Sequence, residues 1–191
     1  MKPLLKGLLA FVVALILGLG SAVAVVVHPP KNLTVNNGPW QTNLAVGSAQ
    51  SGMYMRATVA LAGLFALNKS ETIYFLARTD DDGLPLRSRC EYIVEGGDLN
   101  ARWWSITLYG WDCYLIPNEA GRHSYNGKNI GRETDDRFRI HVSSASKEGN
   151  WLPSGDQRRM YLTLRLYNPA PEVYQNPGTV ALPSIKRVRC P

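Results

Sequence analysis

Three segments of the chain, 102–110, 137–143 and 160–167, alternate between apolar and polar side chains at every second position. Successive side chains of a β-strand point to opposite faces of a sheet, so this period predicts strands with one buried face. In the first segment the predicted inward residues are Trp104, Ile106 and Leu108. The period restricts the fold to antiparallel sheets around an apolar core.

Three more segments have the composition of strands. Residues 71–78 and 89–95 are rich in β-branched and aromatic side chains, and residues 180–188 predict an edge strand that Pro183 interrupts. Gly, Pro and Asn turns separate the strands. We therefore expect a mainly β fold, an antiparallel β-sandwich of the jelly-roll kind.

Residues 51–67 change to a helical period. Apolar side chains recur there at the spacing of one helix face, at Met53, Ala57, Ala60, Leu61, Leu64 and Phe65. Asn68, which tolerates the left-handed conformation, is placed to end the helix. We expect this helix to cover the sandwich with its apolar stripe.

The run from Gly7 to Val27 has no charged side chain, and Lys2 and Lys6 precede it. About 20 apolar helical residues span the hydrocarbon core of a bilayer, and a positive flank stays in the cytoplasm. We favour a retained membrane anchor. The alternative is a cleaved signal peptide, because residues 21–24 (Ser-Ala-Val-Ala) offer the small side chains that signal peptidase requires. Both alternatives export the rest of the chain.

The chain accordingly divides into an anchor or signal sequence (1–27), a tether (28–49) and a β-sandwich domain (50–191). The tether is rich in Asn, Gly, Pro, Ser and Thr, and one short strand is expected at 43–46. The expected location is the bacterial inner membrane, with a single pass and the C-terminal domain in the periplasm.

The formal net charge of +6 does not predict a nucleic-acid partner. Lys2 and Lys6 contribute to it, and most other basic residues are dispersed, whereas nucleic-acid binding requires a cluster. The basic tail, Lys186, Arg187 and Arg189, is interpreted as solvated surface. The membrane is therefore the expected partner, and a small-molecule or envelope partner stays unidentified.

The cysteines are Cys90, Cys113 and Cys190, and export would place them in an oxidising compartment. Cys113 adjoins apolar strand residues and is interpreted as a buried thiol. We predict a disulfide between Cys90 and Cys190, which would tie the C-terminal tail to the sheet. Cys90–Cys113 and Cys113–Cys190 are the alternative pairings.

The sequence contains no motif typical of catalysis, a metal site or a cofactor. The histidines lack metal-site spacing; they are His28, His123 and His141. The acidic turn 80–82 lacks the other ligands of a calcium loop, so we interpret it as solvated. A triad of Ser105, His141 and Asp112 has no support beyond residue type.

The polar and aromatic faces of two predicted strands indicate where a ligand would bind. Tyr109 lies on one strand, and Arg165 and Tyr167 lie on the other. Rings, hydroxyls and one guanidinium suit a sugar, a lipid headgroup or an anionic small molecule. The alternative is an ordinary wet sheet face with cross-strand pairs. Arg122 and Trp151 complete the candidate ligand-binding residues, although a structural role at the end of the sandwich is favoured for Trp151.

Four motifs occur in the order and at the spacing of one bacterial family: 104–109 (WSITLY), 116–124 (IPNEAGRHS), 150–153 (NWLP) and 164–167 (LRLY). From about residue 50 to 190 the chain resembles the family catalogued as domain of unknown function 1214. The resemblance implies an exported protein in a short, membrane-anchored form, without an established activity. Family members often carry Asp directly after the Tyr, where this chain has Gly110.

Two functions remain open at this point. We expect a membrane-anchored periplasmic module that binds a ligand or assists the cell envelope, without catalysis. The alternative is a periplasmic hydrolase with a pocket formed by Arg165, Tyr109 and Asp112. A deep pocket that holds an acid or histidine of strongly perturbed pKa would favour the hydrolase.

Overall fold

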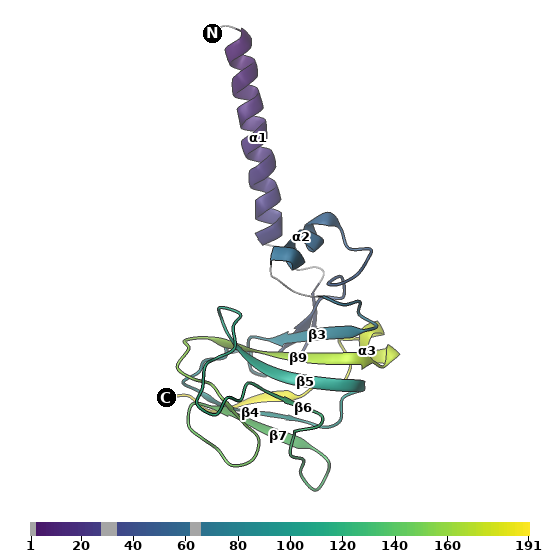
Figure 1. The fold of residues 1–191 in the computed structure, drawn as a ribbon, viewed down its shortest axis with the longest axis vertical. Helices are drawn as coiled ribbons and strands as arrows, with labels where there is room; N and C mark the ends of the chain where they lie inside the picture. The colour runs from purple at the N-terminus through teal and green to yellow at the C-terminus, as the bar shows by residue number, and fades with distance from the viewer. Residues whose placement is uncertain (1–2, 28–33, 62–65) are drawn as a thin grey trace.

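The computed structural model describes residues 3–27, 34–61 and 66–191. The fold is mainly β, and its strands form two sheets (Figure 1). The six-stranded sheet has the order β1 (Val35–Asn37), β2 (Trp40–Thr42), β3 (Thr72–Ala77), β9 (Met160–Pro169), β5 (Ala101–Gly110) and β6 (Ser124–Asn126). The four-stranded sheet has the order β10 (Ser184–Arg189), β4 (Glu91–Gly96), β7 (Phe138–Ser143) and β8 (Trp151–Pro153). The described helices are α1 (Pro3–Val27), α2 (Met53–Leu61) and α3 (Pro171–Gln175).

The strands predicted from alternation and composition are all present. β9 pairs antiparallel with both β3 and β5, and its register places Leu164 opposite Phe75 and Ile106. β10 begins directly after Pro183 and forms an edge of the four-stranded sheet, as predicted. One pair departs from a purely antiparallel fold, because β7 and β8 run parallel.

The two sheets share one hydrophobic core. The Trp104 ring of the six-stranded sheet stacks on the Phe138 ring of the four-stranded sheet, with the ring centroids 5.1 Å apart. Ile106, Ile140 and Leu164 are fully buried in the same cluster. Burying one such aliphatic or aromatic side chain contributes about 1.5–3 kcal/mol, so the alternating positions supply much of the stability of the fold.

Part of the predicted tether belongs to the six-stranded sheet. The expected strand at 43–46 is wrong, because the Asn43 side chain accepts a hydrogen bond from the Ala45 amide and turns the chain there. The strands of this region are β1 and β2 instead. Trp40 on β2 is buried, and its indole N–H donates a 2.7 Å hydrogen bond to the Pro183 carbonyl.

The predicted covering helix does not cover a sheet. α2 ends at Leu61, and residues 62–65 of the predicted helix lie outside the described residues. None of the residues of α2 is buried, and Met53 and Leu61 are largely exposed. α2 lies beside the C-terminal end of α1 (Figure 1), where the Thr58 hydroxyl donates a hydrogen bond to the Val26 carbonyl.

α1 is long and apolar enough to cross a membrane, and none of its residues is buried. A rise of about 1.5 Å per residue gives its 25 residues a length that exceeds the hydrocarbon core of a bilayer. A signal sequence near the N-terminus has the same properties. α1 is therefore a candidate span.

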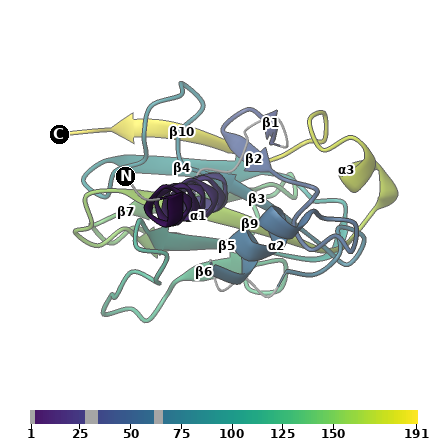
Figure 2. The same cartoon turned by 90° about the horizontal axis from the view of Figure 1, so that it is seen from above.

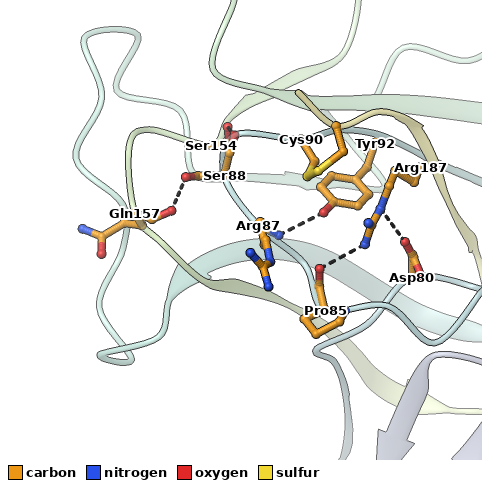
Figure 3. The surroundings of a disulfide bond; sticks show 10 residues. Asp80, Pro85, Arg87, Ser88, Cys90, Tyr92, Ser154, Gln157 and Arg187 are labelled. Carbon is orange, nitrogen blue, oxygen red and sulfur yellow. Dashed lines mark hydrogen bonds and ion pairs between the residues drawn. A yellow bond between two sulfur atoms is a disulfide. The ribbon is translucent and has the colours of Figure 1, made fainter.

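The predicted disulfide between Cys90 and Cys190 is confirmed (Figure 3). It joins the start of β4 to the end of the chain, directly after β10. The prediction of a buried Cys113 is wrong, because this thiol is exposed in the turn after β5, where its backbone has a positive φ of 69°. A disulfide is consistent with an extracytoplasmic domain.

The prediction of a solvated acidic turn and a solvated basic tail is wrong for Asp80 and Arg187, which bind each other, whereas Asp82, Lys186 and Arg189 are exposed. Asp80 is buried, and one of its carboxylate oxygens lies 2.8 Å from Arg187 Nε (Figure 3). Asp81 accepts the backbone N–H of Ile185 at 3.0 Å, which holds β10 to the same turn. Arg189 donates a hydrogen bond to Glu91 at 2.8 Å. These acids therefore bind the C-terminal strand.

Candidate functional site

β3, β9 and β5 present one face of the six-stranded sheet away from the core. Their register places the following side chains on this outer face: Thr72, Tyr74, Leu76, Trp103, Ser105, Thr107, Tyr109, Tyr161, Thr163, Arg165 and Tyr167. Arg165 is the one charged side chain in this set, and the set contains no carboxylate. The polar faces of β5 and β9 do share one surface, because the two strands are direct neighbours.

The small hydroxyl side chains of this outer face are shielded from water by their neighbours. The hydroxyl side chains of Ser105, Thr107 and Thr163 are buried, with exposed fractions of 6%, 7% and 5%. Larger rings beside them form pairs. Tyr109 stacks on Tyr161 at 5.5 Å between centroids, and Trp103 meets Tyr167 edge-on at 5.1 Å.

Arg165 is fixed by two hydroxyl groups. Its Nη1 donates a 3.1 Å hydrogen bond to Thr107 Oγ1, and its Nη2 donates a 2.8 Å hydrogen bond to the Tyr109 hydroxyl. The guanidinium carbon also lies 5.4 Å from the centroid of the Tyr109 ring. Both acceptors are neutral, so the positive charge of Arg165 is oriented without being neutralised.

Two further arginines lie against aromatic rings at one end of the outer face. Arg78 follows β3 and lies 5.8 Å from the Tyr161 centroid and 5.9 Å from that of Trp111. Arg159 precedes β9 and lies 5.5 Å from the Trp111 centroid. Such cation–π contacts hold a guanidinium in place but leave its charge uncompensated.

Ion pairs are distributed unevenly over the molecule. Those between described residues lie on the four-stranded sheet, on the loops beside it and on the tail; they involve Asp80, Glu91, Glu95, Asp98, Arg132, Glu133, Asp136, Arg137, Arg139, Lys147, Lys186, Arg187 and Arg189. In the described part of the chain, none involves Arg78, Arg159 or Arg165. The charges of these three arginines are therefore not compensated by an ion pair with another described residue.

Two tyrosines of the outer face, Tyr161 and Tyr74, have a raised pKa, which favours the neutral phenol. Burial raises the pKa of Tyr161, the neighbouring Cys113 and Tyr109 raise it further, and Arg78 opposes the shift. Burial also raises the pKa of Tyr74, with Arg165 opposing it. Their phenol O–H groups consequently remain available as hydrogen-bond donors at neutral pH.

The predicted ligand-binding residues fall into two separate groups. Tyr109, Arg165 and Tyr167 lie together on the outer face. Arg122 lies in the loop before β6, Trp151 lies on β8 of the four-stranded sheet, and both contact a residue that the sequence did not single out. Arg122 Nη1 donates to the Tyr125 hydroxyl at 3.0 Å, and that hydroxyl accepts the Trp151 backbone N–H at 2.8 Å.

Tyr125 lies on β6 and Trp151 on β8, so their bond joins the two sheets. The neighbouring Asn150 binds backbone groups, donating to the carbonyls of Gly131 at 2.7 Å and Arg139 at 2.9 Å. These contacts match the structural role expected for the 150–153 loop. Arg122 and Trp151 therefore do not extend the outer-face site.

Ser105, His141 and Asp112, the residues of the hypothetical catalytic triad, lie in different parts of the fold. Ser105 lies on the six-stranded sheet, His141 on the four-stranded sheet, and Asp112 in the turn after β5. Asp112 Oδ1 accepts the Tyr114 backbone N–H at 3.2 Å. No group of His, Cys, Asp and Glu side chains in the described part of the chain is arranged to hold a metal ion.

Two clefts lie away from Arg165. One, of 290 Å³, lies beside α3, and its polar lining includes Asp98, Asn100 and Glu172. The other, of 450 Å³, lies between α2 and the loop 47–51. The outer face at Arg165 lines neither of them, and the Arg165 side chain is partly exposed.

The family model described as protein of unknown function (DUF1214) matches residues 71–171, which include β3, β5, β9 and the whole outer face. The chain belongs to the DUF1214 family. No curated protein matches its sequence. The match agrees with the resemblance that the four sequence motifs indicated.

Solved structures similar to this DUF1214 chain come from uncharacterised proteins. The VPA0106 protein from Vibrio parahaemolyticus is 25% identical with a TM-score of 0.61, over 73% of this chain and 36% of that one. An uncharacterised protein from Burkholderia cenocepacia is 21% identical with a TM-score of 0.41, over 62% of this chain and 29% of that one. This chain thus spans about a third of the length of these proteins.

Proposed function

We propose that this DUF1214 chain is a membrane-anchored periplasmic module that binds a small anionic ligand on the outer face around Arg165. α1 is its retained anchor, and the two sheets form a β-sandwich of the jelly-roll kind. The shared core supports the sandwich, and the Cys90–Cys190 disulfide supports an oxidising compartment.

The proposal depends on one observation, the set of contacts that the Arg165 guanidinium makes. Its guanidinium is held by two neutral hydroxyls and has no ion-pair partner among the described residues. A guanidinium has five N–H donors, and Thr107 and Tyr109 each accept one hydrogen bond from it. The remaining donors suit a carboxylate or a phosphate, which a guanidinium binds through a two-pronged contact.

The surrounding rings add a preference for the rest of the ligand. Tyr109, Tyr161, Trp103 and Tyr167 present ring edges and faces beside Arg165. A flat or apolar group attached to the anion would pack against these rings and gain about 0.5–1.5 kcal/mol for each well-placed aromatic contact. We therefore propose an anion that carries a ring or another flat apolar group.

Phenyl phosphate is a simple probe with this chemistry. The Tm of the full-length chain in a nonionic detergent is measured at increasing concentrations of phenyl phosphate. The same titration with phenyl glucoside, which has no charge, is the control. Binding to the native state raises the Tm in a concentration-dependent way. We expect phenyl phosphate to raise the Tm more than phenyl glucoside does.

The matched variants are Arg165→Gln and Arg139→Gln. Arg139 lies on the other sheet and is paired with Glu133 at 3.1 Å, so its loss leaves the outer face intact. We expect the phenyl phosphate effect to persist in Arg139→Gln and to disappear in Arg165→Gln. An equal rise in both variants, or no rise in the parent protein, would overturn the proposal.

A further inference from the structure

α2 carries an apolar stripe whose two ends are not covered by the described residues of the chain. Met53, Ala57 and Leu61 are spaced four residues apart and therefore lie on one helix face. Met53 is 76% exposed and Leu61 is 77% exposed. Exposing two large apolar side chains on one helix face is unfavourable in water, so this stripe indicates a contact outside the described residues.

The opposite face of α2 is directed toward the protein. Met55 and Val59 line the cleft that α2 forms with the loop 47–51. Arg56 Nε donates a 3.0 Å hydrogen bond to the Ser51 carbonyl. These contacts fix the rotation of α2 about its axis, so the stripe of Met53, Ala57 and Leu61 faces away from the loop.

α2 lies at the end of the candidate membrane span. The Thr58 hydroxyl donates a 3.0 Å hydrogen bond to the carbonyl of Val26, in the last turn of α1. If α1 crosses the bilayer, its last turn lies where the acyl chains meet the headgroups. α2 therefore lies at that same depth.

We propose that α2 is an interfacial helix whose Met53–Ala57–Leu61 stripe inserts into the surface of the bilayer that α1 crosses. This inference depends on the proposed anchor. The composition of α2 fits the headgroup boundary: apolar side chains on the stripe, the half-exposed Tyr54 beside them, and Arg56 as its one charge. Tyrosine is enriched at this depth.

Insertion of α2 would fix the orientation of the domain on the membrane. Viewed along α1 in Figure 2, β3, β9 and β5 lie beneath α1 and α2. The outer face with Arg165 belongs to these strands. A second membrane contact beside the anchor would therefore hold the outer face near the bilayer surface.

The test uses the full-length chain in phospholipid nanodiscs, in a Cys113→Ser background with the native disulfide intact. Single cysteines at Met53→Cys and Leu61→Cys are labelled with the polarity-sensitive fluorophore NBD. Ser146→Cys, on an exposed loop beside the four-stranded sheet, is the control outside the membrane. Val12→Cys in α1 is the control inside the membrane.

We expect lipids with a doxyl quencher near the headgroup to reduce NBD fluorescence at positions 53, 61 and 12, and to leave position 146 unchanged. Quenching at 12 without quenching at 53 and 61 overturns the inference and leaves the anchor in place. Absence of quenching at 12 contradicts the anchor itself. A blue-shifted but unquenched label at 53 would show that a second copy of the chain covers the stripe, which also overturns the inference.

Discussion

The carboxylate of Asp80 and the guanidinium of Arg187 lie 2.8 Å apart, and the Asp80 side chain has no solvent exposure. The other Asp80 oxygen accepts the Leu84 backbone N–H at 2.8 Å. The pair joins the turn after β3 to β10, and thus connects the two sheets near the disulfide (Figure 3).

We expect Asp80→Ala to destabilise the domain strongly, because it leaves Arg187 and the Leu84 amide without their acceptor. Breaking a buried ion pair costs about 3–5 kcal/mol, and the partial exposure of Arg187 favours the lower end. Urea unfolding measures the loss. The exposed Asp82→Ala is the control, and equal effects of the two substitutions would contradict the role of Asp80.

We expect the double variant Cys90→Ser, Cys190→Ser to be less stable, because its unfolded chain gains conformational entropy when the disulfide is absent. The disulfide closes a separation of 100 residues, for which loop-closure entropy gives about 4–5 kcal/mol. Cys113→Ser removes the exposed free thiol and should leave the urea midpoint nearly unchanged. If the two variants unfold at the same urea concentration, the disulfide does not stabilise the domain.

Tyr161 should titrate above the ordinary tyrosine value of 10.0, because burial and its neighbours favour the neutral phenol. A group whose pKa is raised by folding stabilises the native state below its unfolded pKa, and this contribution is lost as the pH rises. The difference in phenolate absorbance between the parent chain and Tyr161→Phe should therefore appear above pH 10 in the native state. In concentrated urea the pKa of Tyr161 should return to the ordinary tyrosine value. A native transition at or below the denatured one would contradict the prediction.

The sequence predicted the strands because alternation is local: each segment carries its own period-two pattern. It also placed Tyr109, Arg165 and Tyr167 on polar faces for the same reason. Which strands pair is not local. The pairing of β5 with β9, which brings Tyr109 to Arg165, depends on the packing of the whole core.

The sequence analysis missed structural residues whose interaction partners are distant in the chain. Asp80 and Tyr125 were not recognised as structural because their partners, Arg187 and Trp151, are distant in the chain. Of the predicted stripe, Met53, Ala57 and Leu61 lie on one face of α2, but that face does not cover a sheet. A helical period states that one face is apolar, but it does not state whether a sheet or a bilayer covers that face.

We expect the N-terminal helix to be retained. Because α1 is longer than the apolar core of a signal peptide, the intact mass of the membrane-extracted protein should include residues 1–27, apart from the initiator Met. The control is a variant with an engineered signal-peptidase site in place of residues 21–24, which should yield the shorter mass. A native chain that begins at Val25 would show that α1 is a cleaved signal sequence.

The central claim is that Arg165 binds the anion, and the side-chain Nε–H resonance of Arg165 tests it most directly. The resonance is assigned in the ¹⁵N-labelled full-length chain by its absence in Arg165→Lys. Titration with phenyl phosphate should shift this resonance progressively and leave that of Arg139 unchanged. If phenyl phosphate shifts the resonances of other arginines but not that of Arg165, the claim is wrong.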